Sequence, residues 1–461
     1  MGNTAFIRVS DHGSSNEPLT KPPFGGGWCN QSAKFMNLQG SELVVANGHY
    51  KNLRVVIIGG GPTGLAAALL LKQRNHLRPV VYEACPEPTT IGGAIGIQPN
   101  GMRIFKLLGV YDELIARGSP GTNVTLHSVR GSVMGQLDFV SWSKKKTGCC
   151  QLEIRRVDLM EVLCDAARKA GLEIHYNKTL VEIKERDREV MANFSDGTTD
   201  TADFLLGCDG LRSGVRTLYV DPETEPEYSG ISDIYSLVPT SDHPTPTGLP
   251  RATHATFTTD GFFALMCCTK SRDVNYWFFS SEFPASTSST NPDGTVHNFK
   301  PVMRNAASKV KGEWGNVLTD FIDKSKVLKF HPICTLPLGG VWHKGRCLLL
   351  GDAAHAMSPH AGQGVSMALE DVLFLSRLLG EPSLELNDVF TRYEGKRRSR
   401  VDEIYKTAKK NGAMRKKTGP WRLWFNELVM VAFLTVYRIL NLQSFGFGQK
   451  TLVYDISEES L

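Results

Sequence analysis

Two glycine-containing segments, far apart in the chain, carry the residue types and spacings from which we infer the chemistry. The first runs from Gly59 to Gly64 and has the pattern G-x-G-x-x-G. In such a loop Gly59 permits a tight turn, Gly61 lets the backbone approach a pyrophosphate, and Gly64 allows a helix to pack closely on a strand. The phosphate charge is met by the N-terminus of the following helix. The segment therefore predicts dinucleotide binding.

The flanking sequence supports this prediction. Residues 53–58 form a short apolar run typical of a buried parallel strand, 65–72 favour a helix, and 79–83 favour a second strand. Glu83 ends that second strand about 20 residues after the loop, where a carboxylate can accept hydrogen bonds from an adenosine ribose. The chain therefore contains one βαβ unit at Rossmann spacing.

The second segment covers residues 351–364. Asp352 follows another apolar run, so its carboxylate can accept hydrogen bonds from a ribityl hydroxyl. Gly362 and Gly364 expose backbone N–H groups at the start of a predicted helix, about 365–379, which suits the pyrimidine end of a flavin. Pro359 restricts the loop beside the ring. A glycine loop alone leaves NAD, NADP and FAD open, whereas a second site nearly 300 residues later favours FAD.

Composition narrows the classes of protein. A chain of 461 residues with 41% hydrophobic and 21% charged residues is long enough for two or three globular domains. The net charge of +5 and the absence of a basic, aromatic stripe argue against nucleic-acid binding. The ten cysteines are scattered without zinc-ligand spacing, which predicts reduced thiols in an intracellular protein and no metal site.

Three segments in this order resemble the class A flavoprotein monooxygenases. They are 59–64 with Glu83, 207–216 and 351–364, and the resemblance spans about residues 53–400. Cys208 stands where that family often has alanine. The resemblance implies an α/β fold: a Rossmann-type FAD-binding domain (GR2-like), an inserted antiparallel-sheet substrate domain and a helical C-terminal tail.

The predicted domain boundaries follow from composition and from this resemblance. The predicted parts are an irregular extension (1–50), the first part of the FAD-binding domain (51–225), a substrate domain (226–335), the second part of the FAD-binding domain (336–400) and a helical tail (401–461).

The resemblance also implies roles for single residues. The family associates its central Asp-Gly segment with both FAD and NAD(P)H, which implicates Asp209 and Arg216. Arg156 fits the family pattern Arg-x-x-Leu for an FAD contact, with Arg155 as competitor, and Gly96 lies in a small-residue loop that resembles the family's flavin lining. The predicted cofactor-binding residues are Gly59, Gly61, Gly64, Glu83, Gly96, Arg155, Arg156, Asp209, Asp352, Pro359, Gly362, Gly364 and Val365.

Candidates for substrate contact are less distinctive. Arg216 and Tyr235 are the predicted catalytic residues. Tyr276 and His254, like Tyr235, fall in the predicted substrate domain and could orient a substrate hydroxyl, although sheet packing explains such residues equally well. His355 is predicted to be packed or hydrogen-bonded near its loop and not to act as a base.

The resemblance implies a monooxygenase with tightly, noncovalently bound FAD. NAD(P)H would reduce the flavin, O2 would give a C4a-hydroperoxide, and one oxygen atom would enter a small apolar aromatic or alkene substrate. The two subfamily cues differ: loop 92–101 resembles fungal meroterpenoid epoxidases, and 351–364 resembles salicylate hydroxylases and zeaxanthin epoxidases. The extension and tail favour a role in specialised metabolism. The alternatives are a flavin-dependent reductase without oxygen insertion and a non-catalytic FAD-binding scaffold.

The tail offers two interpretations. Residues 421–442 favour a helix, but its apolar core, 428–437, is half the length of about 20 residues that a membrane-spanning helix needs. The helix either packs on the domain or lies at a membrane interface, with Trp421, Trp424 and Tyr437 beside Arg422 and Arg438. The predicted location is intracellular, cytoplasmic or peripherally membrane-associated.

Overall fold

The described part of the chain comprises residues 50–88, 92–241, 252–284 and 299–461 of a computed structural model. Apart from Tyr50, the predicted irregular extension lies outside these residues. All of them belong to one compact unit, Val45–Leu461.

A six-stranded sheet carries the predicted nucleotide-binding pattern. Its inner strands are short apolar runs that are buried on both faces, which is why they pair in parallel under helices. β18 joins antiparallel at one edge. In sheet order the strands are β18 (His343–Lys344), β19 (Cys347–Leu349), β12 (Phe204–Gly207), β1 (Arg54–Ile58), β2 (Arg78–Tyr82) and β8 (Glu173–His175).

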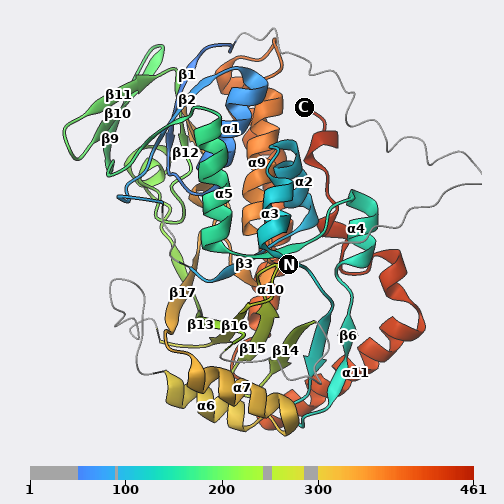
Figure 1. Cartoon of the computed structure of the whole chain (residues 1–461). Helices are drawn as coiled ribbons and strands as arrows, with labels where there is room; N and C mark the ends of the chain where they lie inside the picture. The colour runs from blue at the N-terminus through green and yellow to red at the C-terminus, as the bar shows by residue number, and fades with distance from the viewer. Residues whose placement is uncertain (1–49, 89–91, 242–251, 285–298) are drawn as a thin grey trace, which may run out of the picture. The chain divides into compact units, whose positions relative to one another are not determined.

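Three helices pack next to one another on this sheet: α1 (Pro62–Asn75), α5 (Arg156–Lys169) and α9 (Gly364–Leu378) (Figure 1). Further helices, α2 (Pro99–Leu107) and α3 (Tyr111–Arg117), complete this layer. The sheet and helices share one hydrophobic core. The strand-helix order predicted around both glycine segments is confirmed.

A seven-stranded sheet forms the predicted antiparallel layer. Its pairs are antiparallel except for the parallel pair of β14 and β5. In sheet order the strands are β17 (Lys329–Thr335), β13 (Glu227–Pro239), β16 (Val274–Ser281), β15 (Phe262–Cys267), β14 (Thr253–Phe257), β5 (Val124–His127) and β6 (Val133–Leu137). β5 and β6 come from before the predicted substrate domain, 226–335, which is therefore not the whole of this sheet. The sequence did not predict these two strands, because strands this short carry no clear two-residue alternation.

Alternation along β13 and β16 gives this sheet two different faces. Ile234, Trp277 and Phe279 point to one face, where α6 (Lys300–Ser308) and α7 (Gly312–Lys324) cover them (Figure 1). Tyr235 and Tyr276 point to the other face. The outer part of that second face is covered by α11 (Pro420–Ile439).

Smaller elements complete the described fold. Two three-stranded sheets consist of β3 (Ala94–Ile97), β7 (Leu152–Arg155) and β4 (Ser119–Pro120), and of β11 (Thr199–Ala202), β10 (Glu189–Phe194) and β9 (Leu180–Arg186). The remaining helices include α4 (Ser141–Thr147), α8 (Asp352–His355) and α10 (Leu386–Ala413). Among the described residues, no helix is long and apolar enough to cross a membrane.

A buried ion network joins α9 to α10. Arg397 Nε lies 2.8 Å from Asp371 Oδ1, and its Nη1 lies 2.8 Å from Glu370 Oε2. Arg400 lies 3.3 Å from Glu370, and Asn100 on α2 donates to Glu370 at 2.7 Å. All five side chains are buried, so each charge depends on its partners in place of water.

We expect the Arg397→Met variant to lower the free energy of unfolding by about 3–5 kcal/mol, because it leaves Asp371 buried without its cation. Urea titration measures the loss. The matched control is Arg188→Met, which alters an exposed arginine and should change stability by less than about 0.5 kcal/mol. Equal effects of both substitutions would contradict the network's role.

Candidate active site

Of the three motif glycines in the loop after β1, only Gly61 has open space beside it. Gly59 has φ +106°, and a Cβ there would overlap the carbonyl group of Cys208. A Cβ at Gly64 would overlap the Gly59 carbonyl oxygen. A Cβ at Gly61, by contrast, would meet no atom within 4 Å. The fold itself requires Gly59 and Gly64, whereas Gly61 faces open space at the N-terminus of α1, where a pyrophosphate would bind.

Glu83 directly follows β2, beside this loop. Its Oε2 accepts a hydrogen bond from Gly60 N at 2.7 Å, and Oε1 accepts one from Cys85 N at 2.9 Å. The carboxylate is half-buried. Glu83 is therefore fixed at the carboxyl end of the strand, where a ribose hydroxyl can approach it.

Asp352 opens α8 at the carboxyl end of β19. Gly351 and Ala353 on either side are buried, but Asp352 is exposed. Nevertheless the surrounding protein is dense enough that burial raises the pKa of the carboxyl, while the charges of His355 and Arg156 oppose the rise. Asp352 is thus accessible at the carboxyl end of β19.

The loop from Ser358 to Val365 supplies backbone and polar groups at the start of α9. Gly362 has φ +62°, and a Cβ at Gly364 would meet no atom within 4 Å. Pro359 is exposed and Val365 is half-buried. In the described part of the chain no hydrogen-bond partner is found for three buried atoms of this region: Ser358 Oγ, Gln363 Nε2 and Gln98 Oε1. Such orphaned groups call for a ligand or for water, and a flavin pyrimidine ring offers both donors and acceptors.

Asp209 lies after β12, next to the glycine loop. Its Oδ2 accepts a hydrogen bond from Val215 N at 3.2 Å, and burial raises the pKa of the carboxyl. Its Oδ1 is buried and lacks a partner among the described residues. Asp209 is thus available to a cofactor near Gly59.

Arg216 is buried and donates to backbone carbonyls. Nη1 lies 2.9 Å from Ala353 O, Nη2 lies 2.7 Å from Leu211 O, and Nε lies 3.2 Å from Thr224 O. The guanidinium thereby ties the 207–216 segment to the backbone beside Asp352. This geometry supports a positioning role and gives no direct substrate contact.

The two adjacent arginines have different surroundings. Arg155 forms a bidentate ion pair with Asp158, with both N–O distances 2.6 Å. The Arg156 side chain instead lies against Gly92, and a Cβ added at Gly92 would overlap the Arg156 side chain. Burial raises the pKa of Asp352 and of Tyr235, and the positive charge of Arg156 opposes both rises. Arg156 is therefore exposed near Asp352 and Tyr235, whereas Arg155 is paired with Asp158.

The loop that precedes β3 meets the substrate sheet. A Cβ at Gly93 would overlap the Tyr276 ring and lie 3.0 Å from the Tyr235 ring, and the two ring centroids are 5.8 Å apart. Gly96 lies within β3, where a Cβ would come 3.0 Å from the buried carboxylate of Glu153. Gly96 thus makes room for Glu153, while Tyr235 and Tyr276 contact the loop predicted to line the flavin.

His254 lies on β14 but points to the opposite face. Its Nδ1 is 2.9 Å from His127 Nε2, and the His127 ring stacks on Trp314 at 4.7 Å. Trp314 belongs to the core under α6 and α7. His254 is therefore a packing residue, as the sequence allowed.

Sequence reasoning missed Asp371, which organises the second glycine segment. Its Oδ2 accepts hydrogen bonds from Gly351 N at 2.9 Å and from His355 Nε2 at 2.6 Å. Burial acts against the charge, but His355 and Arg397 hold the pKa of Asp371 below its usual value. The only signal in the sequence was an acidic pair inside an apolar helix. His355 is hydrogen-bonded beside its loop, as predicted.

His360 and Arg415 were also missed. Neither ring nitrogen of the buried His360 has a partner among the described residues, and burial together with Arg415 lowers the pKa of His360 to about 3. Arg415 is 3.0 Å from Ser280 Oγ and lies over the rings of Phe262 and Phe278 at 4.6 and 5.5 Å. His360 belonged to a motif already singled out, but no local pattern marked Arg415.

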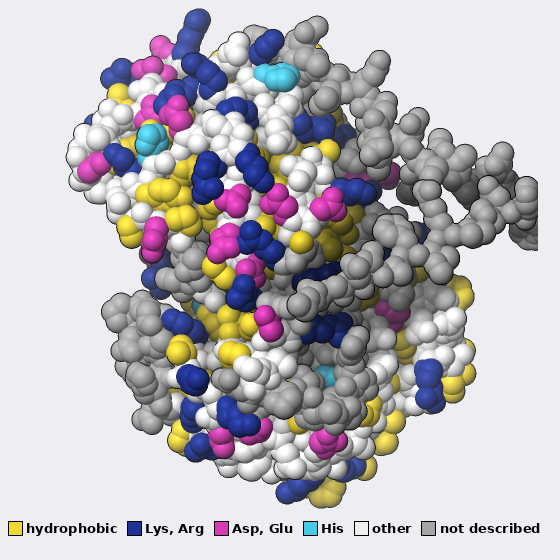
Figure 2. All heavy atoms as spheres, in the orientation of Figure 1, with side chains coloured by type: hydrophobic (Ala, Val, Ile, Leu, Met, Phe, Trp, Pro, Cys, Tyr) yellow, Lys and Arg dark blue, Asp and Glu magenta, His cyan; other side chains and the backbone are white. Residues whose placement is uncertain are grey.

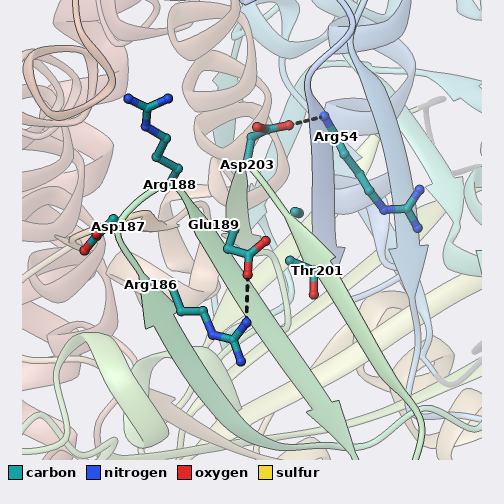
Figure 3. Close-up of a pocket in the computed structure, with 8 residues that line it drawn as sticks. Arg54, Arg186, Asp187, Arg188, Glu189, Thr201 and Asp203 are labelled. Carbon is teal, nitrogen blue, oxygen red and sulfur yellow. Dashed lines mark hydrogen bonds and ion pairs between the residues drawn. The ribbon is translucent and has the colours of Figure 1, made fainter.

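An open cavity of about 600 Å³ lies elsewhere, among β9, β10, β11 and the start of β1 (Figure 3). Two contacts link residues of its lining: the Arg54 backbone N–H donates to Asp203 at 2.7 Å, and the Arg186 guanidinium lies 3.1 Å from Glu189. Arg54 is the first residue of β1, so this cavity is at the amino ends of the parallel strands. Cofactors bind at the carboxyl ends, where Gly61, Glu83 and Asp352 converge.

We expect Gly61→Ala to weaken FAD binding at least about tenfold, a loss of about 1.4 kcal/mol, without destabilising the protein freed of FAD. The added methyl enters open space in the fold but occupies the expected pyrophosphate position. Titrating the apoprotein with FAD measures the affinity.

Gly395→Ala is the matched control, since a Cβ there also meets no atom within 4 Å but lies within α10. It should leave FAD affinity unchanged and raise stability by about 0.5–1 kcal/mol. An unchanged affinity in the Gly61→Ala variant would refute the proposed pyrophosphate position.

Comparison with known proteins agrees with this geometry. The FAD binding domain family model matches residues 52–408. The chain is 30% identical over 371 residues to 6-hydroxynicotinate 3-monooxygenase of Pseudomonas fluorescens, covering 80% of this chain and 93% of that protein. It is 28% identical over 391 residues to a salicylate hydroxylase of Pseudomonas putida, covering 78% of this chain and 85% of that protein.

Solved structures share the fold. HpxO of Klebsiella pneumoniae, complexed with FAD and uric acid, has a TM-score of 0.71 at 23% identity, covering 86% of this chain and 97% of that one. A salicylate hydroxylase substrate complex has a TM-score of 0.68 at 22% identity, covering 88% and 98%. The chain therefore belongs to the FAD binding domain family and is a class A FAD-dependent monooxygenase.

Proposed function

We propose that this protein uses FAD, NAD(P)H and O2 to insert one oxygen atom into a small apolar aromatic or alkene substrate. The observation that carries the proposal is the meeting of two surfaces. Tyr235 and Tyr276 of the substrate sheet contact Gly93 of the loop expected to line the flavin. A ring or alkene held against these tyrosines lies beside the flavin edge.

The cofactor supplies the redox chemistry, and the chain supplies its position. Bound FAD would supply hydride acceptance from NAD(P)H and activation of O2, the chemistry by which one oxygen atom would enter the substrate and the other would leave as water. We propose that Gly61 and the N-terminus of α1 hold the pyrophosphate, Glu83 the ribose and Asp352 the ribityl chain. The Gly362 N–H donates to Pro359 O at 2.9 Å, so we propose that the N–H at Gly364, at the N-terminus of α9, would meet the pyrimidine ring, where negative charge would develop on reduction.

We propose distinct roles for the three arginines near the site. Arg156 is exposed and contributes positive charge near Asp352 and the tyrosines. Arg155, paired with Asp158, keeps the start of α5 in place, although the sequence had grouped it with the FAD contacts. Arg216 positions the backbone at Ala353 and thereby acts on the cofactor through the protein.

The substrate side is mainly aromatic. β13, β15 and β16 place the rings of Tyr235, Tyr276, Phe262 and Phe278 on one face, which supports an apolar substrate. The neutral His360 and the Arg415 guanidinium add polar groups at one end of this face. We propose that these two residues orient a hydroxyl or carbonyl oxygen of the substrate.

Product analysis tests the function. The FAD-loaded protein is supplied with NADH or NADPH and with candidate apolar aromatics and alkenes, and the products are identified by mass. We expect a product heavier by one oxygen atom, labelled when heavy-isotope O2 is used. A reduced product without added oxygen would establish the alternative, a flavin-dependent reductase. Absence of substrate-dependent NAD(P)H oxidation would indicate a non-catalytic protein.

We expect Tyr235→Phe to lower kcat/KM about tenfold, equivalent to the loss of one hydrogen bond, with an unchanged flavin spectrum. More NAD(P)H should be oxidised per product molecule, because the substrate is less well oriented. The control is Tyr228→Phe on the same strand, whose hydroxyl donates to Phe283 O at 2.8 Å away from the loop. A drop of the same size in the control would argue against a substrate contact at Tyr235.

The biological setting is part of the proposal. We propose a role in specialised metabolism, because the segments before residue 52 and after residue 408 add to the core that the family model matches. We further propose an intracellular location with peripheral membrane contact through the C-terminal tail.

A further inference from the structure

Helix α11 presents an unusual outer face. On a surface helix the residues that point away from the protein are normally polar. Here they are almost all apolar, from Trp421, which is 84% exposed, to Ile439, which is 70% exposed. Figure 2 shows hydrophobic side chains along the lower right edge of the view, where Figure 1 places α11. The exposed large apolar residues of this helix are Trp421, Trp424, Phe425, Leu428, Val429, Val431, Val436 and Ile439.

The inner face fixes α11 along its whole length. Near its start, Glu427 accepts hydrogen bonds from Ser128 Oγ at 2.9 Å and from Val129 N at 2.8 Å. Near its end, Leu434 is buried and the Tyr437 hydroxyl donates to Asp138 O at 3.2 Å. The sequence had placed Tyr437 with the interfacial aromatics, but it is buried on the inner face. The helix therefore lies flat on the protein, and its exposed side is mainly apolar.

The positions of the arginines follow from helical geometry. At about 100° per residue, Trp421, Phe425, Leu428 and Ile439 lie within one sector opposite the buried stripe. Arg422 and Arg438 fall on the two borders of that sector. In this arrangement the guanidinium groups of Arg422 and Arg438 lie at the sides of the helix, while the apolar side chains point away from the protein.

The charge around this face is positive. From Lys417 to Tyr454 there are four Lys or Arg residues and one acidic residue, Glu427, which is buried. The chain after α11 extends the apolar surface with Phe445, 70% exposed, and Phe447, 49% exposed. Next to it, α4 carries three exposed lysines, Lys144–Lys146.

We infer that α11 is a docking face for an anionic lipid bilayer. The helix lies in the plane of the membrane surface, the apolar sector enters the boundary between headgroups and acyl chains, and Arg422 and Arg438 meet lipid phosphates. The lysines of α4 add attraction to anionic headgroups. This inference makes the proposed peripheral location specific and is independent of oxygen insertion.

Charge complementarity favours a membrane over a second copy of this chain. In a two-fold symmetric dimer the same patch faces itself. Pairing α11 with its own copy would bring the basic borders of two positive surfaces together, and juxtaposed like charges oppose association. An anionic bilayer offers acyl chains to the apolar sector and negatively charged headgroups to the arginines at its borders.

Vesicle flotation with the full FAD-loaded chain tests the inference. The probes are vesicles of phosphatidylcholine alone and of three parts phosphatidylcholine to one part phosphatidylserine. We expect strong flotation with the anionic vesicles, weaker flotation with the neutral ones, and loss of the difference at high salt. The Arg422→Gln/Arg438→Gln variant should bind anionic vesicles at least about tenfold more weakly, since each basic residue contributes about 1 kcal/mol.

The Trp421→Ser/Phe425→Ser/Leu428→Ser variant should lose binding to both kinds of vesicle while keeping its flavin spectrum and activity. The matched control, Leu107→Ser/Val302→Ser/Val327→Ser, removes similarly exposed apolar side chains from other elements and should float like the unaltered protein. Failure of the unaltered chain to float overturns the inference, and so does equal flotation of the α11 variant. A dimer that this variant converts to monomer, with no flotation, would assign the face to self-association.

Discussion

The buried carboxylate of Asp371 is the interaction on which the rest of the site depends. It accepts hydrogen bonds from Gly351 N and His355 Nε2 on one side, and Arg397 Nε lies 2.8 Å away on the other. A carboxylate without access to water stays charged only while these partners remain. The Gly351 turn, α9 and α10 are therefore fixed together, and Asp352 is left as the open acidic group of that turn.

The charged residues of the site fall into two groups: those paired within the protein and those left exposed. Arg155, Arg216 and Asp371 have their polar atoms occupied by protein partners, and they fix backbone segments relative to one another. Arg156 and Asp352 are exposed, and they are the groups that we propose a cofactor meets. Because the first group is rigid, the second group is held in place before any ligand binds, which is how an enzyme positions a flavin and its substrate without reorganisation.

The seven-stranded sheet connects the cofactor side to the tail. Its face toward the flavin loop carries Tyr276, and the same face continues under α11, where Phe278 and Met266 pack near Met430 and Phe433. One helix thus has an inner surface on the substrate sheet and an outer surface that we assign to a bilayer. An apolar substrate and an apolar docking face are consistent properties of one protein.

The sequence by itself determined the cofactor, the order of elements around both glycine segments and the family. These depend on local backbone geometry, such as the positive φ at Gly59 and the open space at Gly61 and Gly364, which short motifs encode. It did not predict β5 and β6 in the substrate sheet, the hydrogen-bond and ion-pair partners of Asp371, or the position of Arg415 near His360. Only the tertiary structure decided these points, because they depend on which distant residues share a buried space, and pairing over such distances leaves no periodicity or spacing in the chain.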